Sequence, residues 1–161
     1  MSHRKLDIDA LHLDDDDDQL EALAAQVDLP ALQSAAQARA SDVANALSRG
    51  DTAGAIRAAL AGEHPYGAAS GPTADPKLGA IKDQSTKPVV DALSAARAAD
   101  IPALVAALSP ADLDLLLKYV YRGMASPVGV NCAALLAWHE KITEVAGVGA
   151  VLRVIGDGRA I

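Results

Sequence analysis

The stretch SPADLDLLLKYVYRG, residues 109–123, carries the clearest fold signal of the chain. Ser109 and Asp112 form a Ser-x-x-Asp capping box, Pro110 suits the first helical position, and Gly123 suits a helix end. The stripe of apolar residues is wide enough to predict a helix that is surrounded by other helices or by a partner. It consists of Leu113, Leu116, Leu117 and Val120, widened by Leu115 and Tyr119.

A polar strip occupies the remaining side of this helix. Asp114, Lys118 and Arg122 follow one another at intervals of four residues, with the acid before the bases. Side chains four residues apart are neighbours on a helix surface, so the spacing predicts ion pairs within the helix.

Two helices are predicted toward the N-terminus. Residues 31–49 are helical in composition, and Ser41 and Asp42 suit the cap of a second, shorter helix inside this segment. Gly50 is a natural stop, and Asp51 then caps TAGAIRAAL in a helix pair with a tight turn.

A loop and an interrupted helix come next. Residues 62–76, GEHPYGAASGPTADP, predict a surface loop that ends in a cap at Asp75 followed by Pro76. Pro88 then predicts a break or kink just before it and a new helix over residues 88–99.

Asp100 precedes IPALVAAL much as Asp51 precedes TAGAIRAAL, so we expect Asp100 to cap a helix as well. Residues 51–60 and 100–108 therefore resemble two copies of one helical hairpin. Repeated hairpins favour a stacked, solenoid-like arrangement.

Two further helices are predicted beyond residue 123. Ser126 and Pro127 suit a helix start, and Gly147 suits its end. VGAVLRVI, residues 148–155, fits a short buried helix or a strand, and we favour a helix because the chain offers no other strand to pair with it. We expect GDGRAI, residues 156–161, to fray. The first of these helices has a narrow apolar seam, Leu135, Trp138, Ile142 and Val145.

Composition supports the same fold class. Alanine, the best helix former, accounts for 36 of 161 residues, and aromatic residues make up only 2%. We predict an all-α, compact, solenoid-like array of about six to seven helices with an extended acidic N-terminal arm.

Charge divides the chain into two parts. Residues 1–28 hold nine acidic residues against Arg4 and Lys5, which accounts for the whole formal net charge of −7. Residues 29–161 hold equal numbers of acidic and basic residues. We therefore predict an acidic, largely extended arm over residues 1–28 and an all-helical domain over residues 29–161.

The same features exclude several classes of partner. Nucleic acid needs a basic face, and an anionic membrane surface would repel the arm. The sequence has no apolar run of the roughly 18 residues that a membrane span requires. The single cysteine, Cys132, excludes a disulfide framework, so we expect a soluble protein inside the cell.

No residue pattern predicts catalysis. The four histidines lack a second ligand at helical spacing, and the Gly147–Gly149 fragment lacks the third glycine of a dinucleotide fingerprint. Cys132 fits a small packed hydrophobe and His139 a structural residue. We therefore expect no enzyme activity, no metal and no cofactor. A small hydrolase built on Cys132 and His139 stays the weakest alternative.

The arm itself has two kinds of sequence. Asp14 to Asp18 lack the spacing and the glycine of a calcium loop and fit a solvated, extended segment. RKLDIDALHL, residues 4–13, alternates apolar and charged side chains instead. Such a segment can become ordered on the surface of a partner.

Several blocks resemble one known family. LDLLLKYVYRGMASP, LLAWHEK and GVGAVLRVI, in that order, are similar to subunit 5 of the actin-related protein 2/3 complex. The likeness is dense over residues 112–155 and looser over residues 41–108. RKLDID, residues 4–9, resembles the N-terminal arm of that family, whereas GDGRAI lacks its basic tail.

The resemblance implies a non-catalytic, cytoplasmic structural subunit of the assembly that nucleates branched actin filaments, with ATP bound by other subunits. It implies a helical body docked on subunit 4 and the β-propeller subunit 1, and an arm that reaches actin-related protein 2. The arm residues that match are Arg4, Lys5, Leu6, Asp7, Ile8 and Asp9.

Four residues of the body are candidates for partner contact: Tyr119, Tyr121, Trp138 and His139. We expect Tyr119 or Tyr121 to reach the interface, whereas Trp138 suits the core or the interface equally well. The alternative to the structural subunit is a free-standing helical-repeat adaptor with an acidic tail.

Overall fold

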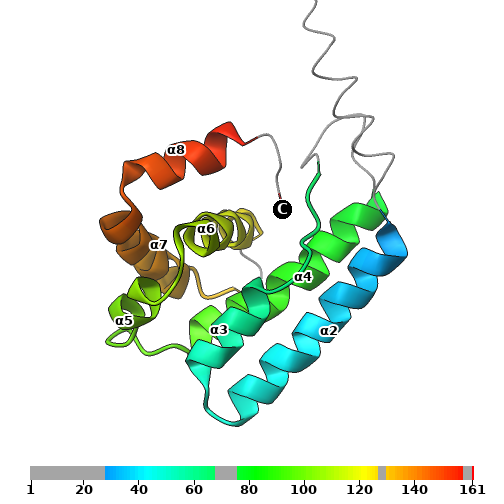
Figure 1. The fold of residues 1–161 in the computed structure, drawn as a ribbon, viewed down its shortest axis with the longest axis horizontal. Helices are drawn as coiled ribbons and strands as arrows, with labels where there is room; N and C mark the ends of the chain where they lie inside the picture. The colour runs from blue at the N-terminus through cyan, green and yellow to red at the C-terminus, as the bar shows by residue number, and fades with distance from the viewer. Residues whose placement is uncertain (1–27, 68–75, 127–129, 158–160) are drawn as a thin grey trace, which may run out of the picture.

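The computed structural model describes residues 28–67, 76–126, 130–157 and 161. This part of the chain is all-helical and contains no β-strand, which confirms the predicted fold class (Figure 1). Its seven helices are α2 (Leu29–Ser48), α3 (Thr52–Leu60), α4 (Pro76–Ala95), α5 (Ile101–Ala106), α6 (Pro110–Ala125), α7 (Cys132–Ala146) and α8 (Val148–Gly156).

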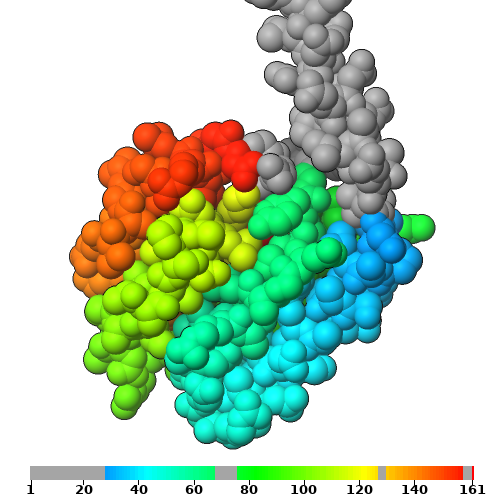
Figure 2. Space-filling view, viewed as in Figure 1, coloured from blue at the N-terminus to red at the C-terminus, as the bar shows by residue number. Residues whose placement is uncertain are grey.

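Helices α2, α3 and α4 pack side by side, and α6 lies against α3, α4, α7 and α8 (Figure 1). Leu113, Leu116 and Leu117 of α6 are buried, as their stripe predicts. They belong to one main core to which every described helix contributes. A smaller core between α2 and α4 contains Leu32, Ala36, Leu78 and Ile81. Figure 2 shows α8 along one edge of the body.

Several helix ends have the predicted caps. The Asp51 carboxylate accepts a hydrogen bond from the Gly54 amide at 2.7 Å. Ser109 and Asp112 form the reciprocal capping box at the start of α6. Gly147, which separates α7 from α8, has a φ of 72°, a left-handed conformation that suits glycine. The cap predicted at Asp75 lies outside the described residues.

Two predicted helix starts and one predicted side-chain cap are wrong. Helix α2 runs through Ser41 without a break, and the Ser41 hydroxyl donates to the Gln37 carbonyl as it does in mid-helix. Asp100 precedes α5 but makes no cap, because its carboxylate accepts from Arg97 Nε at 2.8 Å. Helix α7 starts at Cys132 rather than after Ser126, and its cap is Asn131.

Pro88 does not end a helix. Helix α4 continues from Pro76 to Ala95, with Pro88 in its interior. Proline removes one helical donor, so the carbonyl of Gln84 loses its normal partner. Buried side chains on both sides of Pro88, including Ser85 and Val89, hold the two halves of the helix in one core, and this packing overrides the local preference.

The end of the described chain also differs from the prediction. Ile161 is only 4% exposed and belongs to the main core, so this residue does not fray. Residues 158–160 lie outside the described part. Val145 is wrongly placed in the apolar seam of α7, because it is 57% exposed whereas Leu135, Trp138 and Ile142 are buried.

Candidate partner-binding surface

The large exposed hydrophobic side chains of the described residues gather on α7 and α8. On α8, Val148, Leu152 and Ile155 recur at spacings of four and three residues and are each 66–72% exposed. This spacing places them on one face of the helix. Leu136 and Val145 of α7 are the other two members of the group. An exposed apolar stripe such as the one on α8 is typical of a surface that binds another macromolecule.

The polar strip of α6 holds α8 in place. Arg153 of α8 donates to Asp114 of α6 through Nε and Nη2, both at 2.8 Å. Lys118 Nζ lies 2.6 Å from an Asp157 carboxylate oxygen and 4.8 Å from the centroid of the Tyr66 ring. The hydrogen bonds to Asp114 raise the pKa of Arg153, so the guanidinium stays protonated.

The predicted pairs within α6 are therefore wrong. The third member of the strip, Arg122, also bonds to other elements, through Asp83 of α4 at 2.7 Å and the Ile161 carbonyl at 2.9 Å. The partners of Asp114, Lys118 and Arg122 near the C-terminus are each 39 residues further along the chain. Because both members of a pair advance together, the C-terminal half of α8 runs in the same direction as α6. Spacing alone did not reveal these longer-range partners.

Tyr119 and Trp138 are core residues, each with 0% of its surface exposed. The Trp138 indole N–H donates to the Leu93 carbonyl at 3.0 Å. The Tyr119 hydroxyl lies 2.6 Å from Nδ1 of His64, and burial raises the pKa of this tyrosine. Neither side chain is accessible to a partner. The sequence left Trp138 open between the core and the interface, and the structure places it in the core.

Tyr121 and His139 lie together between α6 and α7, and both are half-buried. The Tyr121 hydroxyl lies 3.0 Å from Nε2 of His139, and the two rings are tilted with centroids 5.6 Å apart. Burial raises the pKa of Tyr121, which therefore stays protonated near neutral pH. These two residues keep partial exposure, and a partner contact through them stays a prediction.

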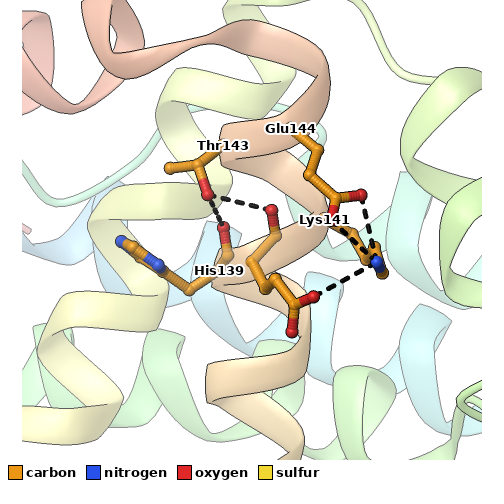
Figure 3. A network of polar contacts seen from close by, with 5 residues as sticks. His139, Lys141, Thr143 and Glu144 are labelled. Atoms are coloured by element: carbon orange, nitrogen blue, oxygen red, sulfur yellow. Dashed lines mark hydrogen bonds and ion pairs between the residues drawn. The ribbon is translucent and has the colours of Figure 1, made fainter.

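Figure 3 shows the side of α7 next to His139. The Lys141 ammonium donates to both oxygens of Glu144 at 2.9 and 3.0 Å and to Glu140 at 3.3 Å. These hydrogen bonds raise the pKa of Lys141. The Thr143 hydroxyl donates to the carbonyls of His139 and Glu140, which ties it to the helix backbone.

Sequence reasoning missed a buried polar cluster beneath residues 61–67. Arg39 donates to the Glu63 carbonyl and to the Ser85 hydroxyl, and Lys82 donates to the Gly67 carbonyl at 3.0 Å. Desolvation, with a smaller repulsion from Arg122, lowers the pKa of Lys82 to about 8. The position of Lys82 between the buried Leu78 and Val89 on one face of α4 was the available signal.

His64 joins this cluster to the core. Its Nε2 lies 3.0 Å from the Leu60 carbonyl, which can only accept, so Nε2 carries the hydrogen. Nδ1 then accepts from the Tyr119 hydroxyl. Desolvation lowers the pKa of His64, with a smaller contribution from Arg39, against the opposing effect of the bond to Leu60. This imidazole is thus a neutral structural link between α6 and the end of α3.

The described residues bear on only some of the other predictions from the sequence. The arm residues Arg4 to Asp9 lie outside the described residues. Within the described ranges, no group of three or more His, Cys, Asp or Glu side chains is placed to hold a metal ion. None of the described helices has the length and apolar character needed to cross a membrane.

Fold and surface together define a small all-helical protein with an exposed apolar helix face. The family model described as the ARP2/3 complex 16 kDa subunit (p16-Arc) matches residues 2–161. The chain belongs to this family.

Named relatives agree with the family match. Actin-related protein 2/3 complex subunit 5-C of Xenopus laevis is 36% identical over 114 residues, which cover 71% of this chain and 70% of the relative. Subunit 5 of Dictyostelium discoideum is 34% identical over 123 residues, or 76% and 81% of the two chains. Subunit 5 of Saccharomyces cerevisiae is 36% identical over 126 residues, or 78% and 75%.

Proposed function

We propose that this protein is a non-catalytic structural subunit of an actin-related protein 2/3 complex, the assembly that nucleates branched actin filaments. The family match over residues 2–161 is the observation that carries this proposal. The exposed apolar side chains of α7 and α8 support the proposal, because a subunit that is always bound in an assembly can bury such side chains against a neighbouring subunit. The protein then acts in the cytoplasm, in the actin cytoskeleton.

The helical body is the docking part of the subunit in this proposal. It binds subunit 4 and helps to hold the β-propeller subunit 1. Tyr121 and His139 are the remaining body candidates of the original four, since they are half-buried rather than buried. Contact with actin filaments is indirect, through the assembled complex.

The arm, residues 1–28, is the tether. Its segment Arg4 to Asp9 binds actin-related protein 2, and Asp14 to Asp18 belong to the solvated connection to the body. A tether raises the effective concentration of a bound partner without any new contact on the body. The arm thus keeps actin-related protein 2 near the position from which nucleation starts.

The decisive experiment is a mild native purification of the tagged protein from its own cells, with the mass and composition of the assembly measured. We expect near-equal amounts of this chain, two actin-related proteins and a β-propeller subunit. Recovery of the chain alone, or with an unrelated partner, contradicts the proposal.

The second candidate is a free-standing helical adaptor that binds peptides. One observation favours it, a groove of about 540 Å³ between α2 and α4 whose lining includes Val43, Leu47 and Pro88. An unrelated partner in the native purification, lost when Leu47 or the exposed groove residue Ala44 is changed to a charged residue, is the result that supports the adaptor.

A further inference from the structure

We propose that α8 is a docking helix whose orientation is set by the ion pairs of Asp114 and Lys118, and that it presents Val148, Leu152 and Ile155 to an uncharged apolar surface of a neighbouring subunit. This inference rests on the proposed function and deepens it. It names the surface, the residues that position it and the chemistry of its partner.

Core packing alone attaches α8 weakly. Ala150 is its one buried residue, and Val151 and Val154 are half-buried against the main core. A groove of about 560 Å³ lies between the C-terminal half of α8 and α6, and its lining includes Tyr66, Lys118 and Arg153. Packing therefore leaves the rotation of α8 about its own axis poorly determined.

The two ion pairs determine that rotation. At about 100° per residue, the stripe of Val148, Leu152 and Ile155 lies on the opposite side of α8 from Ala150. Arg153 and Asp157, one turn apart, bond to Asp114 and Lys118 on α6. The Arg153 contact uses two parallel hydrogen bonds, which fix direction as well as distance.

Charge on the surface selects an uncharged partner. The charged groups next to the stripe already have partners within the chain: Arg153 has Asp114, Asp157 has Lys118, and Lys141 has Glu144. Among the described residues near the stripe, an acidic segment such as residues 1–28 therefore meets no unpaired base. Burial of the apolar stripe against an apolar surface is the remaining source of binding free energy.

Area argues against a second copy of the chain. The three exposed side chains of the stripe cover only part of the about 800 Å² that each side of a stable interface contributes. A second copy brings only the same small stripe. A larger subunit can cover the stripe and also reach the flanks of α7, so we assign the surface to a different chain of the assembly.

The surface is tested in the complete complex, with the full-length chain carrying Leu152→Glu or Ile155→Glu. We expect recovery with the neighbouring subunits to fall by about tenfold, because a charge replaces an apolar contact at the centre of the interface. Leu136→Glu is the matched control, since Leu136 is 58% exposed in the second turn of α7, at the end of that helix remote from α8. We expect its recovery to stay within about twofold of wild type.

Three outcomes overturn this assignment. Normal recovery of both α8 variants excludes the stripe as an interface. A wild-type dimer that Leu152→Glu converts to a monomer, measured by sedimentation, assigns the stripe to a second copy. Amide protection of α8 that disappears when residues 1–27 are deleted assigns it to the arm.

The positioning role is tested with Arg153→Asp and with the exchanged pair Asp114→Arg, Arg153→Asp. We expect the single change to lower recovery with the complex by about threefold, with little effect on thermal unfolding because Arg153 is largely exposed. We expect the exchanged pair to restore recovery to within about twofold of wild type. If the ion pair had a purely structural role, recovery of each variant would instead follow its thermal stability. Undiminished recovery of Arg153→Asp, or no rescue by the exchange, contradicts the role.

These results are separable from failure of the proposed function. If the wild-type chain does not co-purify with the complex, the function itself is wrong. If it does and the α8 variants behave as wild type, only the docking assignment is wrong.

Discussion

The hydrogen bond between Tyr119 and His64 is the most buried side-chain contact that α6 makes. We predict that Tyr119→Phe lowers the free energy of unfolding by about 1–2 kcal/mol, because it leaves Nδ1 of His64 without its donor inside the core. Urea denaturation measures this change. Tyr121→Phe removes the equivalent hydroxyl from a half-buried pair, and we expect a smaller loss of about 0.5 kcal/mol. Equal losses in the two variants would contradict the burial argument.

His64 also makes stability depend on pH. Its pKa in the folded state is lowered from 6.5, so the folded state binds fewer protons than the unfolded state just below that pH. The contribution of His64 to stability is complete above about pH 6.5 and is lost as pH falls through the folded pKa. We predict that the free energy of unfolding decreases from pH 7 to about pH 5 and that His64→Gln makes the decrease shallower. An unchanged slope in His64→Gln would contradict this account.

Two aspartates that look alike in sequence differ at the scale of the helix. Asp51 caps α3 through the Gly54 amide, whereas Asp100 makes no cap for α5. We predict that Asp51→Ala lowers the free energy of unfolding by about 1 kcal/mol. Asp100→Ala should change it little, because the Asp100 carboxylate bonds only to the highly exposed Arg97 among the described residues. Thermal unfolding of the two variants compares them, and a larger effect at Asp100 would show that α5 needs its cap after all.

Pro88 gives a second test at this scale. Pro88→Ala restores a backbone donor to the Gln84 carbonyl inside α4 and should stabilise the protein by roughly 1 kcal/mol. The gain is smaller than the ~3 kcal/mol typical of proline in a helix interior, because the buried ring also packs against its neighbours. Pro102→Ala is the matched control, since Pro102 occupies the first turn of α5, where no helical donor is needed. Chemical denaturation that shows no gain for Pro88→Ala would mean that ring packing outweighs the lost bond.

These elements show what the sequence could predict. Caps and stripes are local, so residues 109–123 revealed the start and the buried face of α6. The end predicted at Gly123 is wrong, because Gly123 is buried inside the helix, which continues to Ala125. The course of α4 through Pro88 and the late start of α7 depend on tertiary packing, which a local pattern does not contain. The same limit applies to the surface, because Tyr119 and Trp138 look like interface residues until the fold buries them. The apolar residues of 148–155 were visible, but which of them face outward depends on the contacts with α6.

At the scale of the whole molecule, the proposed function assigns separate roles to the body and the arm. We predict that deleting residues 1–20 leaves the helical body folded and bound to the complex but lowers the rate of branched actin nucleation, because the tether is lost. A pyrene-actin assay with purified complex measures the rate, and circular dichroism checks the fold. Replacing Asp14 to Asp18 with serine keeps the length of the arm and should preserve most of the activity. An unchanged rate after the deletion would remove the arm from the mechanism.

The ion pairs between α6 and α8 have a consequence for how this sequence can change over generations. Asp114 and Arg153 are matched in sign, and so are Lys118 and Asp157. Reversing either member alone places two like charges together, so a lineage that exchanges the signs must pass through a less fit intermediate or acquire both substitutions at once. Orthologous sequences should therefore show positions 114 and 153, and positions 118 and 157, varying as coupled pairs. The residues of the α8 stripe should instead co-vary with residues of another protein, the subunit against which we propose the stripe docks.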